Sequence, residues 1–238
     1  MRGFLFFLIF LELTVAKCDK NAQKLIQSYE AVIGCKNNYI IFKNGKKLLY
    51  DDGEQKSFFK LLNNADIEDM FVFRYPKNFV TKMPLNYDPG RIRNEAFFKM
   101  LYGNSPKEVE KNLVYIPWFG GKIKVTKKEG VAKALEAVYL DLKKQPPKYY
   151  KYLFPIGGTY KWRYIAGTKR LSVHSFGAAI DINVKYSAYW RWQKGAFKNK
   201  IPKEIVQIFE KHGFIWGGKW YHFDSMHFEY RPELVNSE

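Results

Sequence analysis

RLSVHSFGAAIDINV, residues 170–184, places His174 and Asp181 seven residues apart, with a glycine and two alanines between them. If AAIDIN (178–183) forms a strand that follows a turn at Gly177, alternate side chains point to opposite faces of that strand. Asp181 then lies on one face, and the two isoleucines beside it pack into the core on the other. A histidine in the loop before this strand can fold back towards the carboxylate.

A second segment, KWYHFDSMHFEY at 219–230, contains His222 and His227, two of the four histidines of the chain, with Asp224 between them and aromatic residues around them. Added to the pair in the first segment, His227 completes a set of two imidazoles and one carboxylate. Such a set suits Zn²⁺ and leaves its fourth position open for water. Asp224 supplies a spare carboxylate that could take a proton from that water. The two segments together predict a zinc site with a neighbouring base.

Each of these residues also has an ordinary structural role open to it. A lone histidine is more often packed or hydrogen-bonded than a metal ligand. Asp181 could cap a turn, and Asp224 could be a surface acid. His212 closes a predicted helix, where a cation is favourable. His222 shares a face with Asp224 if the segment is extended, which would make it a neighbour of the substrate.

The composition predicts a folded chain with a substantial core. Of 238 residues, 47% are hydrophobic and 18% aromatic, which excludes a disordered protein and fits one large domain or one domain with a smaller extension. Residues 21–34 carry a helical apolar pattern, and residues 38–53 indicate a β-hairpin with a type I′ turn at Asn44-Gly45. We expect a small N-terminal region over residues 17–75 and a main domain over residues 76–238.

The main region mixes helices and hairpins without a βαβ rhythm, which indicates an α+β fold with an antiparallel sheet. Ser105 begins a capping box with proline at the first helical position, so a helix should start there. The other predicted elements are a hairpin over 113–126 around Gly120-Gly121, a helix over 131–142, and a helix over 202–212 that ends at Gly213.

The first sixteen residues, MRGFLFFLIFLELTVA, have an early arginine, an apolar run and small residues before a cut after Ala16, the pattern of a secretory signal peptide. A short membrane anchor is disfavoured because the run is shorter than the roughly 20 residues that span a bilayer, and no later segment is apolar enough to span. Cys18 and Cys35 lie near the mature N-terminus. An oxidising compartment could join them, or they are idle thiols.

The formal charge of +17 indicates anionic partners. Nucleic acid is one such partner, but the lysines are scattered through short runs such as KNGKK and FKNK, and no recognised nucleic-acid module accompanies them. For an exported protein, phospholipid head groups or cell-wall polymers are the more natural anions, and a solvated basic surface is the ordinary explanation. We therefore expect no nucleic-acid partner and leave anionic wall polymers open.

LSVHSFGAAIDIN together with GFIWGGKWYHFDSMHFEY resembles the paired signature S-x-H-x-x-G-x-A-x-D and [DE]-x-x-H of the M15, or VanY-like, zinc peptidases. This family contains D-Ala-D-Ala carboxypeptidases and L-alanyl-D-glutamate endopeptidases. The similarity extends upstream through DPGRIRNEAFFKMLYG and GGTYKWRYIAGTKRLS, so it covers about Asp88 to Glu233. The resemblance implies a Hedgehog/DD-peptidase-like fold, in which an antiparallel sheet and packed helices surround a zinc ion.

The resemblance also implies roles for individual residues. The zinc ligands would be His174, Asp181 and His227. Asp224 would activate the water and then protonate the leaving amine; many family members have glutamate there, and the shorter aspartate reaches less far. Arg163 would bind and polarise the scissile carbonyl, although it could equally be a basic surface residue. The supporting or substrate-contacting candidates are Ser172, which would orient the site, His222 and Trp220.

The aromatic residues of the second segment are expected to form a dry wall that holds the ligands and excludes bulk water, while Gly217-Gly218 allows a tight turn beside the metal. The aromatic residues concerned are Trp216, Trp220, Tyr221, Phe223 and Phe228. Ordinary core packing is the alternative, and for most of them both roles are compatible.

We therefore predict an exported zinc metallopeptidase that hydrolyses peptidoglycan stem peptides next to D-amino acids, with a D-Ala-D-Ala carboxypeptidase-like activity. An L-alanyl-D-glutamate endopeptidase is the alternative among enzymes, and the sequence does not identify the pocket for a terminal carboxylate that would separate the two. A non-catalytic, zinc-containing cell-wall binding module is the alternative from another class. Asp224 and Arg163 argue against that module, since a structural zinc site needs neither.

Overall fold

A computed structural model describes residues 18–193 and 197–235, and the expected signal peptide over residues 1–16 lies outside them. The helices are α1 (Lys20–Ser28), α2 (Phe58–Asn64), α3 (Glu95–Tyr102), α4 (Pro106–Glu110), α5 (Val131–Lys143), α6 (Tyr150–Leu153), α7 (Lys203–Lys211) and α8 (Pro232–Val235). The strands are β1 (Val32–Lys36), β2 (Tyr39–Phe42), β3 (Lys47–Leu49), β4 (Leu113–Trp118), β5 (Gly121–Thr126), β6 (Ala179–Asp181), β7 (Phe214–Trp216) and β8 (His227–Tyr230).

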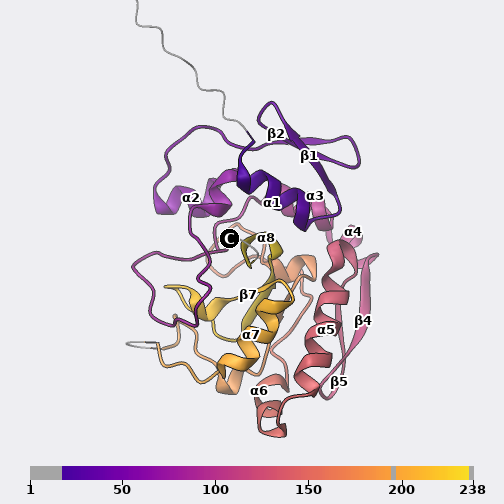
Figure 1. Ribbon diagram of the computed structural model, residues 1–238, viewed down its shortest axis with the longest axis vertical. Helices are drawn as coiled ribbons and strands as arrows, with labels where there is room; N and C mark the ends of the chain where they lie inside the picture. The colour runs from indigo at the N-terminus through magenta and orange to yellow at the C-terminus, as the bar shows by residue number, and fades with distance from the viewer. Residues whose placement is uncertain (1–17, 194–196, 236–238) are drawn as a thin grey trace, which may run out of the picture.

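The described strands form three antiparallel sheets, in the orders β1-β2-β3, β4-β5 and β6-β8-β7. In Figure 1, α1 lies beside α8, α5 runs along the β4-β5 hairpin, and α7 packs next to β7. The predicted α+β class with antiparallel sheets is confirmed. In the sheet β6-β8-β7, β8 lies in the centre and pairs with two segments that are far apart in sequence.

The N-terminal helix is shorter than predicted. The carboxylate of Asp19 caps α1 by accepting the backbone N–H groups of Asn21 and Ala22. The helical pattern predicted up to residue 34 is wrong beyond Ser28, because β1 begins at Val32. Val32 is buried, whereas the next residue, Ile33, is 54% exposed; this alternation is the period of a strand and it overrides the helical spacing.

The predicted hairpin over residues 38–53 is present as β2 and β3, but its turn differs from the prediction. At Asn44-Gly45 only Gly45 has a positive φ, of 79°. Two consecutive residues with positive φ, as a type I′ turn requires, occur instead at Asn37 and Asn38, with φ of 51° and 63°, between the paired residues that end β1 and begin β2. Asparagine tolerates this conformation better than most residues.

The other predicted elements are confirmed. Ser105 caps α4 by accepting the N–H of Glu108, and Trp118 pairs with Gly121 at the end of the β4-β5 hairpin. The predicted helices correspond to α5 and α7, and Gly213 follows α7 with a φ of 85°. Four further helices of the described residues, α2, α3, α6 and α8, were not predicted.

One hydrophobic cluster connects the N-terminal elements with the rest of the chain. The ring of Tyr29 packs edge-on against Phe97 at 5.7 Å, and its hydroxyl donates a hydrogen bond of 2.6 Å to buried Glu233 on α8. Cys18 and Cys35 form a disulfide. The division into residues 17–75 and 76–238 stays a prediction, and the core crosses it.

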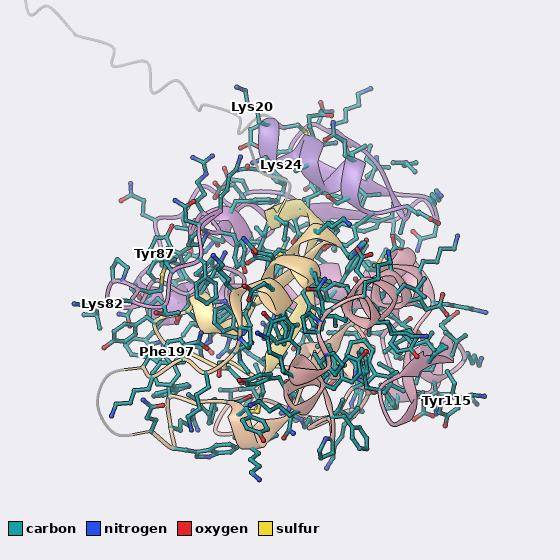
Figure 2. All side chains as sticks on the ribbon, turned by 60° about the horizontal axis from the view of Figure 1, so that its bottom comes forward. Lys20, Lys24, Lys82, Tyr87, Tyr115 and Phe197 are labelled. Carbon is teal, nitrogen blue, oxygen red and sulfur yellow. A yellow bond between two sulfur atoms is a disulfide. The ribbon has the colours of Figure 1, made fainter. Side chains whose placement is uncertain are left out.

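The surface lysines are dispersed over the molecule: Figure 2 places Lys20 and Lys24 on α1 and Lys82 on a different part of the surface. Within the described residues, every helix is too short or too polar to cross a membrane.

Candidate metal centre and active site

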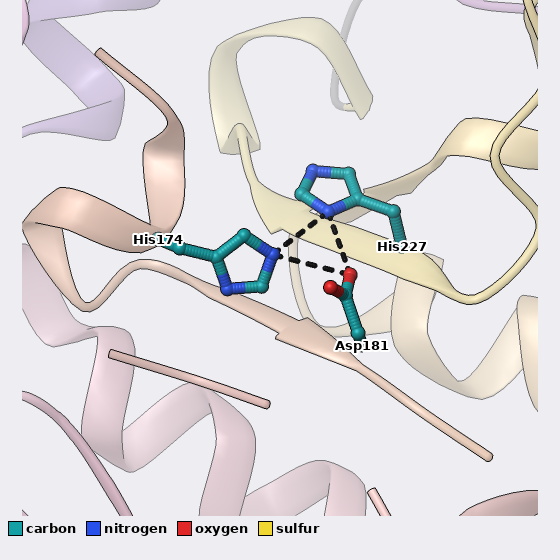
Figure 3. A group of neighbouring side chains, drawn as sticks. All are labelled: His174, Asp181 and His227. Atoms are coloured by element: carbon teal, nitrogen blue, oxygen red, sulfur yellow. Dashed lines mark hydrogen bonds and ion pairs between the residues drawn. The ribbon is translucent and has the colours of Figure 1, made fainter. Parts of the chain in front are cut away.

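His174, Asp181 and His227 converge on one point (Figure 3). Nε2 of His174 lies 3.2 Å from Nδ1 of His227, and Oδ1 of Asp181 lies 3.1 Å from the first nitrogen and 3.0 Å from the second. His174 and His227 are buried, and Asp181 is partly buried. The three residues that the sequence predicted as ligands are therefore brought together.

The antiparallel sheet positions two of these residues. Asp181 at the end of β6 is the direct cross-strand partner of His227 at the start of β8, and directly opposed residues have side chains on the same face. Ile180, one position earlier, is fully buried in the core, as predicted for the opposite face.

His174 lies in a short 3₁₀ turn, Val173–Phe176, that leads into β6. Ser172 caps this turn: its hydroxyl accepts the backbone N–H of His174 at 3.4 Å. Gly177 ends the turn with a φ of 67°, and a Cβ there would lie 2.7 Å from the side chain of Leu113. Glycine is therefore required where the chain reverses from His174 towards Asp181.

A carbonyl and a carboxylate fix the orientation of the two imidazoles. Nδ1 of His174 donates to the backbone carbonyl of Thr159 at 2.5 Å, because a carbonyl oxygen can only accept. Nε2 of His227 lies 3.0 Å from the carboxylate of Glu229, which is fully buried and contacts Arg93 and Arg231. Histidine ligands in metal sites usually make such contacts through their second nitrogen.

These contacts leave three lone pairs directed at one another. When each ring is neutral and donates through its outer nitrogen, both inner nitrogens are acceptors, as is Oδ1 of Asp181. A cation between them removes the repulsion. Ligand atoms about 2.0 Å from a tetrahedral zinc ion lie about 3.3 Å apart, close to the separations of 3.0 to 3.2 Å in this cluster. The residues therefore fit a zinc ion.

The charges of the cluster favour positive charge at the same point. Burial lowers the pKa of His227, but the carboxylates of Asp181 and Glu229 outweigh that effect and raise this pKa to about 10. Burial raises the pKa of Asp181, yet the nearby imidazoles of His174 and His227 hold it well below its ordinary value.

Asp224 lies beside the cluster with one oxygen unsatisfied. Its Oδ1 is buried and has no hydrogen-bond partner among the described residues. Its backbone N–H donates to the carbonyl of Gly217, and its backbone bridges to Tyr189. A Cβ on Gly217 would lie 2.4 Å from the Asp224 carbonyl oxygen, so this close approach needs glycine. Burial, with the charge of Asp181, raises the pKa of Asp224 to about 6.

The site opens into a cavity of about 450 Å³. Its lining contains every residue predicted for the site: His174, Asp181, His227, Asp224, Arg163, Ser172, Trp220 and His222. The indole N–H of Trp220 donates to the carbonyl of Pro89, and its ring centre lies 5.5 Å from that of His227. His222 is held by buried Asp88, at 2.6 Å from Nδ1; it lines the cavity and is not a member of the group of His174, Asp181 and His227.

Arg163 reaches the cavity from an exposed position. Its backbone N–H donates to the hydroxyl of Ser175, which follows His174, and its carbonyl accepts the N–H of Ser172. The segment of Arg163 is thus hydrogen-bonded to the turn that contains His174. This arrangement holds the backbone of Arg163 beside the candidate site, and Arg163 contributes to the cavity lining.

The predicted aromatic wall is only partly correct. Of its five members, Trp220 alone lines the cavity. Trp216 and Phe228 are buried in the core, where their rings stack, and Tyr221 is 39% exposed. The aromatic lining comes mainly from a segment that the prediction overlooked, Tyr189, Trp190 and Trp192. The alternation of aromatic residues and arginine in AYWRWQ was the available signal.

Glu229, Thr159 and Arg93 were also overlooked. Glu229 could have been found from the alternation in HFEY, because residues two apart on a strand share a face and Glu229 follows His227 by two. Thr159 acts through its backbone carbonyl and therefore leaves no signal in the sequence.

Two other groups of acidic residues in the described chain have the spacing of metal sites, around Asp66. The ammonium of Lys56 lies 2.6 to 2.9 Å from carboxylate oxygens of Asp52, Asp66 and Asp69. A lysine therefore already supplies the cation there.

Residues 166–230 match a family model described as D-alanyl-D-alanine carboxypeptidase. The matched residues include His174, Asp181, Asp224 and His227, whereas Arg163 precedes them. No curated protein matches the chain. The match supports a peptidase of the M15 family, and it coincides with the segments that form the cluster.

Proposed function

We propose that this protein is a zinc peptidase that hydrolyses amide bonds next to D-amino acids in peptidoglycan stem peptides, with a D-Ala-D-Ala carboxypeptidase-like activity. The observation that carries this proposal is the convergence of Nε2 of His174, Nδ1 of His227 and Oδ1 of Asp181 within 3.2 Å of one another. The match of residues 166–230 supports the same class of enzyme.

His174, Asp181 and His227 would hold the zinc ion. When bound, zinc supplies Lewis-acid chemistry, which acidifies water and polarises a carbonyl. Thr159 and Glu229 keep the two imidazoles oriented for this task.

Asp224 is the proposed general base and acid. Its unpartnered buried oxygen is available to take a proton from the attacking water, and its raised pKa matches that task near neutral pH. The same carboxyl group then gives the proton to the leaving amine as the amide C–N bond breaks. Arg163 donates hydrogen bonds to the carbonyl oxygen as negative charge develops there. A purely structural zinc site would need neither group, which disfavours a non-catalytic binding module.

The proposed setting is the cell envelope. Peptidoglycan lies outside the cytoplasmic membrane, so this substrate requires export, in agreement with the signal-peptide pattern of residues 1–16. The charge of +17 would attract the chain to anionic wall polymers.

Digestion of purified muropeptides, followed by mass spectrometry, tests the proposal. We expect loss of a terminal D-alanine from pentapeptide stems and no loss after chelation of zinc. Cleavage between L-alanine and D-glutamate would assign the endopeptidase activity instead. Intact muropeptides with the zinc-loaded protein would contradict the proposal.

A further inference from the structure

A second cavity, of about 1080 Å³, lies next to the candidate active site. The two cavities share five lining residues: Arg91, Arg93, Trp190, Arg191 and His222. A substrate bound at the zinc ligands can therefore extend into the second cavity. Nothing in the proposed catalytic steps uses this space.

The charge of the second cavity is strongly positive. Its cationic lining residues are Arg91, Arg93, Lys169, Arg170 and Arg191, whereas Glu95 is its one carboxylate. Glu95 is already engaged, since it pairs with Lys99 and accepts the backbone N–H of Leu171. Arg91 pairs with Asp88, and Arg93 with Glu229.

Within the described residues, Arg170 forms no ion pair with a carboxylate, and the same holds for Lys169 and Arg191; Arg170 differs from these two in having a buried donor atom. Its Nε is buried and has no hydrogen-bond partner among the described residues. Burial, together with the charges of Arg93 and Arg91, lowers the pKa of Arg170 to about 10. A buried donor without a partner is costly, and an anion in the cavity that Arg170 lines would offset the repulsion between Arg170 and its neighbours Arg91 and Arg93. The site is therefore suited to an acceptor that the protein itself does not provide.

We propose that this cavity binds a carboxylate of the same substrate whose amide bond is cleaved at the neighbouring zinc site, with Arg170 as the principal contact. The inference rests on the proposed function and adds a specificity-determining residue to it. A guanidinium presents parallel N–H donors that match the two oxygens of a carboxylate. The apolar lining residues Phe58, Leu62 and Phe98 can contact the aliphatic part of the peptide that carries this group.

A stem peptide carries carboxylates at its C-terminus and on its side chains, and the two sources can be separated by chemical amidation. Three zinc-loaded proteins would be compared. The first is the Asp224→Asn variant, which is intended to bind the substrate without hydrolysing it. The other two carry Asp224→Asn together with either Arg170→Gln or Arg74→Gln. Arg74 is an exposed arginine outside both cavities and serves as the charge-matched control. Binding would be followed by tryptophan fluorescence, because Trp190 lines both cavities.

We expect amidation of one carboxylate, terminal or side-chain, to raise the Kd for the Asp224→Asn protein about 10-fold to 100-fold, the range of a charge-assisted hydrogen bond. The added Arg170→Gln change should raise the Kd for the free acid equally and abolish the effect of amidation. Arg74→Gln should change neither value.

Equal affinity of the Asp224→Asn protein for the free acid and both amides would overturn the inference, and this comparison does not depend on how well the Arg170 variant folds. Retained discrimination in a folded Arg170→Gln protein would overturn the role of that residue. Hydrolysis by the wild-type protein, assayed in parallel, reports separately on the proposed function. Wild-type hydrolysis without carboxylate discrimination rejects only the inference. Discrimination without wild-type hydrolysis rejects the proposed function, and Arg170 then remains the carboxylate contact of a bound peptide that is not cleaved.

Discussion

At the scale of single residues, Asp224 is the side chain that distinguishes an enzyme from a zinc-binding module. Its Oδ1 is buried without a partner next to three residues that are mutually in contact. An unsatisfied buried oxygen is destabilising, and the cost is explained if the carboxylate must remain free to exchange a proton.

We predict that Asp224→Asn lowers kcat for stem-peptide hydrolysis by a factor of at least about 10² while the zinc content is unchanged, because the amide keeps the shape of the side chain and cannot accept the proton. Steady-state kinetics and metal analysis of the same preparation would measure both quantities. Undiminished hydrolysis would show that another group is the base. His212→Ala is a suitable control, since His212 pairs with Asp141 away from the site.

The pH dependence follows from the same residue. Burial raises the pKa of Asp224 to about 6, and the base acts only as the carboxylate. We therefore predict that kcat/KM falls as the pH drops through about 6, or through a lower pH when the charge of bound zinc stabilises the carboxylate. A pH profile with the zinc content checked at each point would measure this. A kcat/KM that rises as the pH falls in this range would contradict the assignment.

At the scale of elements, the pairing of β6 with β8 builds the site. The register places Asp181 opposite His227, and Glu229 lies two residues further along β8 on the same face. One strand therefore supplies both His227 of the cluster and the carboxylate that orients its imidazole.

We predict that Glu229→Gln weakens zinc binding about 10-fold to 100-fold, because the neutral amide is a weaker acceptor for the N–H of His227. Competition with a zinc-chelating dye would measure the affinity. Glu110→Gln is a matched control, since Glu110 is exposed, lies outside both cavities and accepts a hydrogen bond from the hydroxyl of Tyr160. Equal zinc affinities of the Glu229 variant and the wild type would show that the His227–Glu229 contact has no part in metal binding.

Elements with local signals were predictable from sequence. The helix cap at Ser105 and the glycine turn of the β4-β5 hairpin are signals formed by residues adjacent in sequence. Both the helix α4 and the hairpin are present. The end of α1 was not predictable in this way, because Val32 becomes part of a strand only through its partner Phe42. Pairing between residues distant in sequence decides where such a helix ends. The helical spacing of apolar residues carries no information about that pairing.

At the scale of the whole molecule, the N-terminal elements share a core with the candidate peptidase region, and the Cys18–Cys35 disulfide closes the first of them. A disulfide is expected in an oxidising compartment, in agreement with the proposed export. The two cysteines are separated by 17 residues.

We predict that the double variant Cys18→Ser, Cys35→Ser loses about 3 kcal/mol of unfolding free energy, the loop-closure contribution for a loop of this length. Urea denaturation of the oxidised wild type, the reduced wild type and the variant would measure this. The reduced wild type should match the variant. If all three unfold at the same urea concentration, the disulfide does not stabilise the fold.

The cluster of His174, Asp181 and His227 was predictable from sequence because its three members lie in two short motifs, residues 170–184 and 219–230. The arginine cavity was not, since its cations come from Arg91, Arg93, Lys169, Arg170 and Arg191, and only the fold brings these residues together. Likewise, the core aromatic residues Trp216 and Phe228 have the same sequence signal as Trp220, and only packing assigns them to different surroundings.

The most direct test of the account is the zinc content of the purified protein and of variants at the three predicted ligands. We expect the wild type and His212→Ala to hold one zinc ion per chain after dialysis, and His174→Ala, Asp181→Ala and His227→Ala each to lose it while remaining folded. Full zinc occupancy in the three folded single variants would contradict the central claim.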